Sequence, residues 1–389
     1  MAVTTRGPSI PAAALPDQPL GETRMTPAVK IWAGIGAVLV AFIAYVLISW
    51  ISGPYFKEVP SGPSDATGLI GFSVVFWQVI TIPAMLGFWY WFIIRPWRRE
   101  GHVGADGIFV IGFSLMWFQD PLSSAWQHWF VYNTEMVNYG SWLNSVPGVT
   151  AFGAPGAMSS EPILFTPAAY TLAMGVAMMI GTFAMRQTKR RFPNITSFWL
   201  VAACFGIMCL FDVLLEGIIW LPMGVFEYPG GHWAIFPSTY HKYPLNEMIT
   251  IASVWTAIAT VRYFTNDKGQ MVIERGVDQV QGSKTRKLAL RGLAAIAFCQ
   301  IAMFLGYNVP NAIIGANATE WPKDLQQRSY FTNYICGAGT DRPCPGAGTP
   351  NTRDGSQYIN GDGQAASFPS DHEPPGHTIP PIVPFDVGK

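Results

Sequence analysis

The chain has 389 residues, of which half are hydrophobic and only 12% are charged, and its formal net charge is zero. Soluble domains carry roughly 25% charged residues, so this composition and the long uncharged runs indicate an integral membrane protein rather than two soluble domains. Because there is no net positive charge and no basic patch facing outward, nucleic acid is not expected as a partner.

The N-terminal segment, residues 1–29, is rich in Pro, Ala and small polar residues and is predicted to be disordered. It does not read as a cleavable signal peptide, because the first apolar run starts only at Ile31 and is too long. Seven apolar runs follow, each near the roughly 20 residues that a bilayer requires. The predicted spans are 31–51, 69–94, 107–131, 163–185, 196–220, 245–263 and 288–305.

The distribution of Lys and Arg predicts the orientation of these spans. The N-terminal segment and the loops on its side hold 17 of the 24 basic residues, whereas the opposite loops between spans hold only Lys57 and Lys242. Since basic loops stay in the cytoplasm, we expect the N-terminus inside and the C-terminus outside. The sequence therefore predicts an all-α bundle of about seven transmembrane helices over residues 30–306, in the plasma membrane.

The last segment, residues 307–389, is rich in Gly and Pro and is predicted to be an extracytoplasmic tail. In that compartment Cys336 and Cys344 could form a disulfide that closes a small loop. The other three cysteines lie in apolar runs, so they are interpreted as small buried hydrophobes rather than metal ligands.

Two carboxyl side chains, Asp212 and Glu216, lie four residues apart in the outer half of the fifth predicted span. On a helix this spacing puts them on one face. Charged groups in hydrocarbon are costly, so they are expected to face the bundle interior or a wet cavity, near Glu247 at the outer start of the sixth span. No Lys or Arg lies within the fifth span or the outer half of the sixth, so a neutral carboxylic acid beside a carboxylate could serve as general acid and base. The structural alternative is a hydrogen-bond clamp between helices.

A third acid, Asp120, precedes Pro121 in the third predicted span. A helix that stopped at Asp120 would be too short to cross, so we expect the helix to kink at Pro121 and continue. The kink would leave the carbonyl of Trp117 without its helical partner. Asp120 is then either a cap of the kink or an acid or base in a polar cavity.

The outer loops are rich in aromatic and amide side chains. Much of this content is typical of an interfacial aromatic belt, but several polar residues fit a pocket mouth better. The candidate catalytic residues are Asp120, Asp212 and Glu216. The candidate substrate-binding residues are Trp117, Gln127, His128, Tyr132, Asn133, Asn138, Trp142, Glu227, Tyr228, His232 and Glu247.

The sequence lacks the motifs of several common catalytic and cofactor-binding sites. The six histidines form no histidine-box pattern and none lies mid-span, which disfavours di-iron and haem sites. No P-loop, dinucleotide fingerprint or nucleophile elbow is present, and the seventh span lacks the lysine of a retinal Schiff base. Acid–base chemistry or transport remains, with no cofactor and no metal expected.

Short motifs resemble one family of membrane proteins. They are Phe118-Gln119-Asp120-Pro121-Leu122, Tyr132-Asn133, Asn138-Tyr139-Gly140-Ser141-Trp142, Pro147-Gly148, the run from Phe211-Asp212 to Glu216, and Tyr228-Pro229-Gly230. Over roughly residues 30–305 this pattern resembles the avermectin-type spirocyclases, polytopic membrane proteins of actinobacteria. The resemblance implies formation of a spiroketal from a dihydroxyketone, in some members with a dehydration. It assigns no catalytic residue.

Three functional hypotheses follow. The leading one is a membrane-embedded cyclase or dehydratase that acts on a polyketide- or lipid-like substrate through carboxyl acid–base chemistry. A second keeps the acids and changes the substrate to a terpenoid, steroid or other membrane-soluble lipid. The third is a carrier or accessory protein for a lipophilic compound, with the acids as a proton relay or binding groups. The lack of an evident inverted repeat weakens the transport hypothesis.

Overall fold

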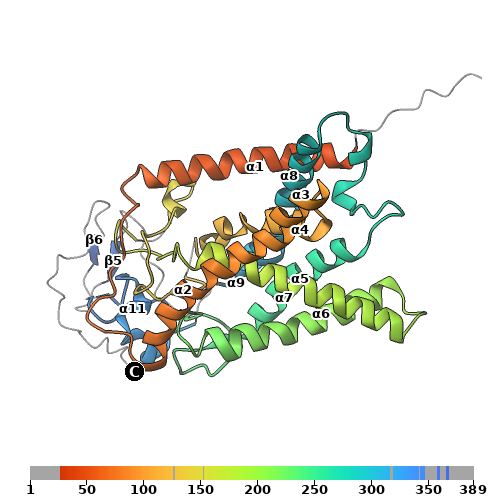
Figure 1. Ribbon diagram of the computed structural model, residues 1–389. Coiled ribbons are helices and arrows are strands. Elements are labelled where there is room, and N and C mark those ends of the chain that lie inside the picture. The colour runs from red at the N-terminus through yellow and green to blue at the C-terminus, as the bar shows by residue number, and fades with distance from the viewer. Residues whose placement is uncertain are drawn as a thin grey trace, which may run out of the picture.

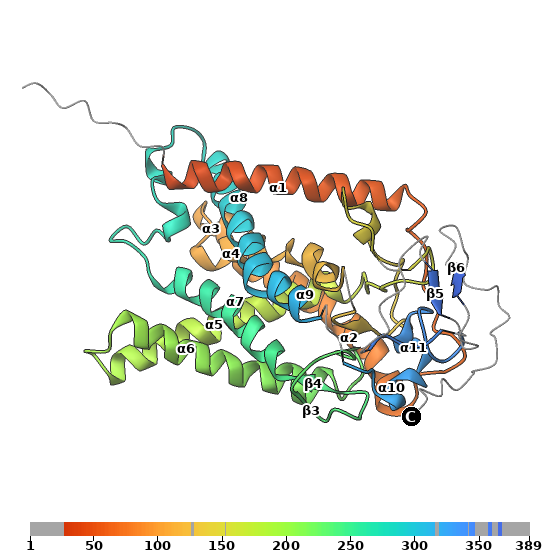
Figure 2. The same cartoon turned by 180° about the vertical axis from the view of Figure 1, so that it is seen from behind.

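The structure is a computed structural model that describes residues 27–125, 128–151, 153–315, 319–340 and 342–346, with two short strands beyond them. Helices dominate it (Figures 1 and 2). They are α1 (Ala28–Ile51), α2 (Gly68–Trp89), α3 (Arg95–Glu100), α4 (Ala105–Phe113), α5 (Thr166–Arg191), α6 (Ser197–Asp212), α7 (Leu245–Tyr263), α8 (Lys284–Met303), α9 (Val309–Gly315), α10 (Lys323–Gln326) and α11 (Ser329–Thr332).

Tighter and wider helical turns connect or extend these helices. The 3₁₀ turns are η2 (Met116–Ser124), η3 (Leu143–Ser145), η5 (Val272–Glu274) and η6 (Val277–Gln279); the π turns are η1 (Tyr90–Ile94), η4 (Val213–Trp220) and η7 (Phe304–Asn308). The strands form antiparallel pairs: β1 (Val131–Tyr132) with β2 (Phe226–Glu227), β3 (Ala234–Ile235) with β4 (Tyr243–Pro244), and β5 (Gln357–Ile359) with β6 (Ala365–Ser367).

Five continuous helical segments are long and apolar enough to cross a membrane. They are Ala28–Ile51, Gly68–Glu100, Thr166–Arg191, Ser197–Trp220 and Lys284–Gly315. This confirms a helical protein of membrane type, while the count of seven spans and the orientation of the termini stay predictions. The last of these segments runs to Gly315, past the end expected at residue 305.

The third predicted span differs from the structure. We expected one helix over 107–131 with a kink at Pro121, but α4 ends at Phe113 and the 3₁₀ helix η2 carries Asp120 and Pro121. A 3₁₀ helix bonds residue i to i+3, so the proline, which has no N–H, leaves the carbonyl of Phe118 rather than that of Trp117 unpaired. The indole Nε1 of Trp142 donates to this Phe118 oxygen over 2.8 Å. A side chain from a later loop therefore stabilises the break.

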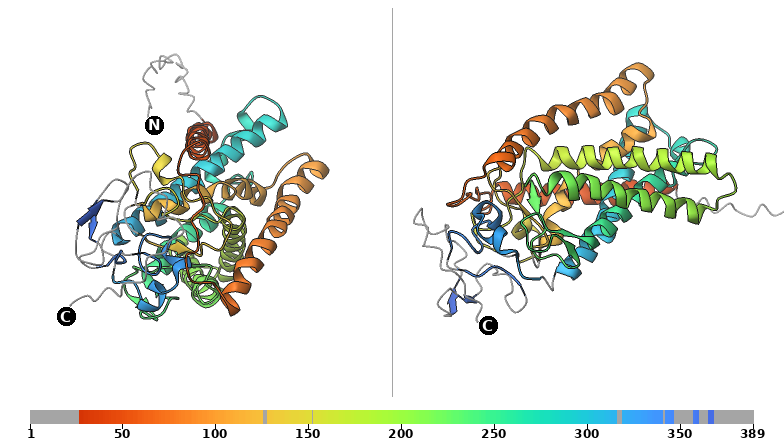
Figure 3. Two further views of the ribbon diagram at one scale, coloured as in Figure 1. Left: turned by 90° about the vertical axis from the view of Figure 1, so that its left-hand side faces the viewer. Right: turned by 90° about the horizontal axis from the view of Figure 1, so that it is seen from below.

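Helix packing follows the chain order in part. α5 and α6 are joined by a short turn and run side by side (Figure 3), and both pack against α7. α1 packs on α8, far along the chain. α1 begins at the end of the molecule that holds the α5–α6 connection, and α10 and α11 lie at the opposite end (Figures 1 and 2).

The segment 319–346 folds onto the loops at that opposite end. Its side chains Trp321, Leu325 and Phe331 form a small hydrophobic cluster with Ile70 and Val131. The bond between Cys336 and Cys344 closes the segment, with a Cα–Cα distance of 4.8 Å. This part of the predicted tail is thus packed against the helical domain as a cap.

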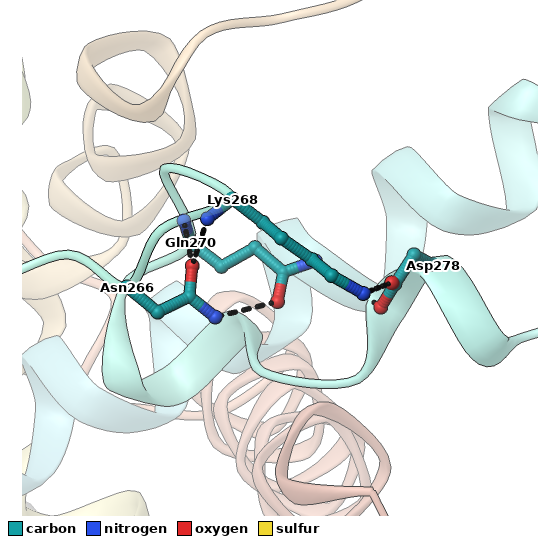
Figure 4. Close-up of polar contacts among 4 residues, drawn as sticks. All are labelled: Asn266, Lys268, Gln270 and Asp278. Atoms are coloured by element: carbon teal, nitrogen blue, oxygen red, sulfur yellow. Dashed lines mark hydrogen bonds and ion pairs between the residues drawn. The ribbon is translucent and has the colours of Figure 1, made fainter.

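The connection between α7 and α8 is held by side-chain contacts (Figure 4). Lys268 forms an ion pair with Asp278, and the Asn266 side-chain oxygen accepts from the backbone amides of Lys268 and Gln270 over 3.0 and 2.9 Å. The hydrogen bond from Lys268 lowers the pKa of the exposed Asp278 to about 2. This connection lies at the basic end of the molecule and does not approach the cavity described next.

Candidate functional site

A cavity of about 530 Å³ lies among α5, α7 and the turns η2, η4 and η7, with β1 and β2 closing one side. Most of its wall is apolar or aromatic. Among the residues that the structure describes, no Lys or Arg side chain lines it. The polar side chains that reach the cavity are Asp120, Tyr132, Tyr170, Glu216, Tyr228, Glu247 and Tyr307.

The first set of polar groups surrounds Asp120, whose side chain is buried. The 3₁₀ helix η2 carries it, and the hydroxyl of Tyr170 on α5 donates a hydrogen bond to its Oδ1. Tyr132 of β1 and Glu161 face the same carboxyl group. One carboxyl on the cavity wall is therefore surrounded by two phenols and a second carboxyl.

Sequence reasoning missed Glu161. It lies in the irregular connection before α5, is buried, and accepts a hydrogen bond from Ser159 over 3.4 Å. Burial, followed by the nearby charge of Asp120, raises the pKa of Glu161 well above its ordinary value. The only sequence signal for Glu161 is an acid two residues before the apolar run that starts at Ile163, and this position alone indicates no role.

The second set lies on η4, α7 and η7. The hydroxyl of Tyr228 donates to Oε2 of Glu216 over 2.7 Å. Glu247, in the first turn of α7, accepts from the amide of Asn311 over 3.4 Å, and Tyr228 and Tyr307 also face it. Two carboxyls and two phenols thus meet at one part of the cavity wall, with Asp120 at another part.

Asp212 does not line the cavity among the described residues, although it is fully buried. The hydroxyl of Tyr243 donates to its Oδ2 over 2.6 Å. The helix changes to a π turn directly after Asp212, and the wider i to i+5 turn rotates Glu216 away from the α-helical i, i+4 line. The acids remain neighbours, but Glu216 reaches the cavity and Asp212 stands behind it.

Four predicted binding residues build the scaffold instead. The side-chain oxygen of Asn138 accepts a hydrogen bond from the backbone amide of Val59 over 3.0 Å. Asn133 donates to the carbonyl of Gly224 over 3.2 Å, and Trp117 donates to the carbonyl of Ser114. Trp142 pairs with Phe118, as described above. In the structure none of Trp117, Asn133, Asn138 and Trp142 is among the described residues that line the cavity.

The remaining predicted residues also lie elsewhere. His128 packs its ring 5.6 Å from that of Trp321, and burial lowers its pKa to about 3, so it is neutral there. Glu227 is fully buried and neither of its carboxylate oxygens has a hydrogen-bond partner within the described chain. His232 lies in a loop with its ring 5.8 Å from Trp233. Gln127 falls outside the described residues.

Strand alternation explains the position of Glu227. Its neighbours Phe226 and Tyr228 both line the cavity, and successive side chains of an extended segment point to opposite sides. Glu227 therefore points away from the cavity, and burial raises its pKa well above the ordinary value. The described residues hold no group of three His, Cys, Asp or Glu side chains placed for a metal ion.

The fold and the site together define a helical membrane protein with a buried, aromatic cavity lined by carboxyl and phenol groups. The sequence profile described as Spirocyclase AveC-like matches residues 97–331, and the chain belongs to this family. The match contains every polar residue that lines the cavity, and Glu161 as well. Neither a curated protein sequence nor a solved structure matches the chain.

Proposed function

We propose that the protein is an intramembrane cyclase that closes a hydrophobic dihydroxyketone into a spiroketal by carboxyl acid–base catalysis. Family membership supports a cyclase-type activity. The observation that carries the mechanism is that Asp120 and the pair Glu216 and Glu247 line one cavity from different elements. Such a cavity can give and take protons at two places on a bound molecule.

The reaction needs two proton transfers. One hydroxyl of the substrate adds to the ketone to form a hemiketal. An acid then protonates the hemiketal hydroxyl, its C–O bond breaks, and water leaves behind an oxocarbenium ion. The second hydroxyl attacks this carbon, forms the new C–O bond and gives its proton to a base. The released water can return that proton to the acid, so the cycle closes without a cofactor.

The geometry suggests which group performs which step. We assign the base to Asp120, because Tyr170 and Tyr132 donate to it and the adjacent Glu161 can hold the proton that this pair of acids retains. Glu216 and Glu247 lie near each other and near Asp212 without a basic partner in the cavity wall. Close carboxyls in a low dielectric do not all ionise, so this group keeps a proton to donate.

The aromatic walls of the cavity favour a reaction through the oxocarbenium ion. Phe165, Trp220 and Phe226 pack on one another in the wall, and Trp255 lines the cavity from α7. Aromatic faces carry negative potential, which stabilises the developing oxocarbenium ion, and apolar walls limit attack by bulk water. Holding the chain folded lowers the entropic part of the barrier.

The test is turnover of a linear dihydroxyketone by purified protein in nanodiscs, with the spiroketal stereoisomers separated by chiral chromatography. Wild-type protein is expected to give one dominant isomer faster than spontaneous closure. Asp120→Asn and Glu216→Gln should each reduce the rate by about a hundredfold, the usual scale of general acid–base catalysis. Asp278→Asn, in the turn η6 before α8 and outside the cavity lining, is the control. Full turnover in both cavity variants would remove the catalytic assignment, and tight binding without product would favour a carrier.

A further inference from the structure

α1 and α8 pack together along part of their length, with a close backbone approach at Gly36, and then separate. At Gly36 an added Cβ would lie 2.0 Å from the carbonyl oxygen of Leu293 on α8, so only glycine allows the two backbones to meet there. Beyond this crossing the helices diverge (Figures 1 and 2). The space between them is a groove of about 790 Å³, lined from α1 by Leu39 and Phe42 and from the opposite side by Phe304 and Leu305.

The groove faces the hydrocarbon of the bilayer. Phe42, Phe304 and Leu305 have exposed fractions of 38%, 48% and 62%. Both walls belong to segments long and apolar enough to span the membrane. A groove in this position is therefore open to molecules dissolved in the lipid, rather than to water.

Amide side chains lie at the bottom of the groove, beneath a surface that is almost entirely apolar. Gln119 and Gln300 are among the groove's lining residues, and both are buried together with Asn308. The Nε2 of Gln119 donates to the backbone oxygen and to Oε1 of Gln300 over 2.8 and 2.5 Å, and Nδ2 of Asn308 donates to Oε1 of Gln119 over 2.6 Å. Burying three amides at the bottom of an apolar groove is costly, and a purely lipid-filled groove would not require them.

This amide cluster separates the groove from the catalytic cavity. On η2, Phe118 and Gln119 line the groove, and the next residue, Asp120, lines the cavity. On the other wall, Leu305 lines the groove and Tyr307 the cavity. The turns η2 and η7 therefore form one layer of the protein, with the groove on one side and the cavity with its carboxyl and phenol groups on the other. Both parts of the layer are non-α turns, which often mark hinges or functional sites.

We propose that the groove binds the alkyl chain of the substrate as it enters sideways from the bilayer, and that Gln119, Gln300 and Asn308 form the partition it passes. This inference rests on the proposed function, because it takes the substrate to be a lipophilic hydroxyketone. The apolar walls bind the alkyl chain, and the amides exchange their mutual hydrogen bonds for bonds to the arriving hydroxyl or ketone. A phospholipid acyl chain carries no polar group that could bind these amides and would gain nothing from them.

The probe is a long-chain dihydroxyketone with a diazirine on its alkyl chain, photolysed with the protein in nanodiscs. Adducts are expected on groove residues of α1 and η7, and excess unlabelled dihydroxyketone should displace them. Leu39→Trp, which fills the groove, should lower this labelling and raise the half-saturating substrate concentration by about tenfold, a typical loss for an obstructed apolar contact. The rate at saturation should stay unchanged. Val38→Trp, on the neighbouring and 70% exposed face of α1, is the matched control.

Equal labelling in Leu39→Trp and Val38→Trp would overturn the inference. It would also fail if photoreactive phosphatidylcholine labelled the groove and the dihydroxyketone did not displace it. Phe304→Trp fills the groove from the other wall and repeats the test if Leu39→Trp does not fold. Asp120→Asn separates this inference from the proposed function. If Asp120→Asn loses turnover but keeps the groove labelling, the result supports both the catalytic role of Asp120 and substrate binding in the groove. If the variant keeps full turnover, Asp120 has no catalytic role, and the labelling alone then decides whether the groove binds substrate.

Discussion

Glu161 faces Asp120 across the wall of the cavity, and both carboxyl groups are buried. Asp120 comes from a 3₁₀ helix, and Glu161 comes from the irregular chain that leads into α5. Two acids in contact without a basic partner favour a shared proton.

Replacing Glu161 by Gln should make the protein less sensitive to alkaline pH. The folded-state pKa of Glu161 is raised above 4.5, so the folded protein binds the proton more strongly than the unfolded chain. The stabilisation is complete below pH about 4.5 and is lost as pH rises through the folded pKa. Glutamine mimics the protonated acid. Thermal unfolding between pH 5 and 9 should show a smaller decline for Glu161→Gln than for wild type, and parallel declines would contradict the contact.

Removing the phenol that donates to Asp120, or the one that donates to Glu216, should distinguish the base from the acid. Tyr170→Phe deletes the donor to Asp120, and Tyr228→Phe deletes the donor to Glu216. A hydrogen bond to a charged group is worth about 1.5–3 kcal/mol, so Tyr170→Phe should slow turnover by roughly ten- to a hundredfold if Asp120 is the ionised base. Tyr228→Phe should have a smaller effect, because its partner is the protonated group. Tyr139→Phe, in an exposed aromatic stack with Phe56, serves as the control, and equal effects of the two cavity variants would contradict the division.

Trp142→Phe should destabilise the protein. The substitution keeps an aromatic ring but removes the donor to the Phe118 carbonyl, which Pro121 leaves without a helical partner. An unsatisfied buried carbonyl costs about 1–3 kcal/mol. Chemical unfolding in detergent measures this loss. Trp233→Phe, at a position 72% exposed, should be neutral, and equal stability of the two variants would show that the bond does not matter.

Breaking the bond between Cys336 and Cys344 should loosen the cap. The bond closes a loop with a sequence separation of 8, for which the chain-entropy estimate is about 2.5 kcal/mol. Hydrogen exchange of residues 319–346 should speed up in the double Ser variant and in reduced wild type to the same extent. The spans α5 and α6 provide the internal reference, and unchanged exchange in the cap would contradict its dependence on this bond.

The orientation of the protein can be tested through the same two cysteines. The excess of Lys and Arg in the N-terminal segment and in the loops on its side predicts that the cap lies outside the cell. After mild reduction of intact cells, an impermeant maleimide should label Cys336 and Cys344. Labelling that requires lysis would reverse the predicted orientation.

The sequence by itself determined the helical membrane character, the family and most of the acids of the site. These properties are local, because an apolar run of sufficient length predicts a span wherever it packs, and an acid in such a run is buried whatever its partner is. Asp120, Glu216 and Glu247 could be singled out on this basis, and all three line the cavity.

The tertiary structure decided which groups meet. The π turn after Asp212 moves that residue behind the cavity, and the 3₁₀ turn at Pro121 ends the third predicted span. Glu161 reaches Asp120 through a connection without periodicity. Residues far along the chain fix the backbone of such turns and connections; Trp142, for example, donates to the carbonyl of Phe118. Hydrophobic periodicity therefore cannot predict where the side chains of these segments lie.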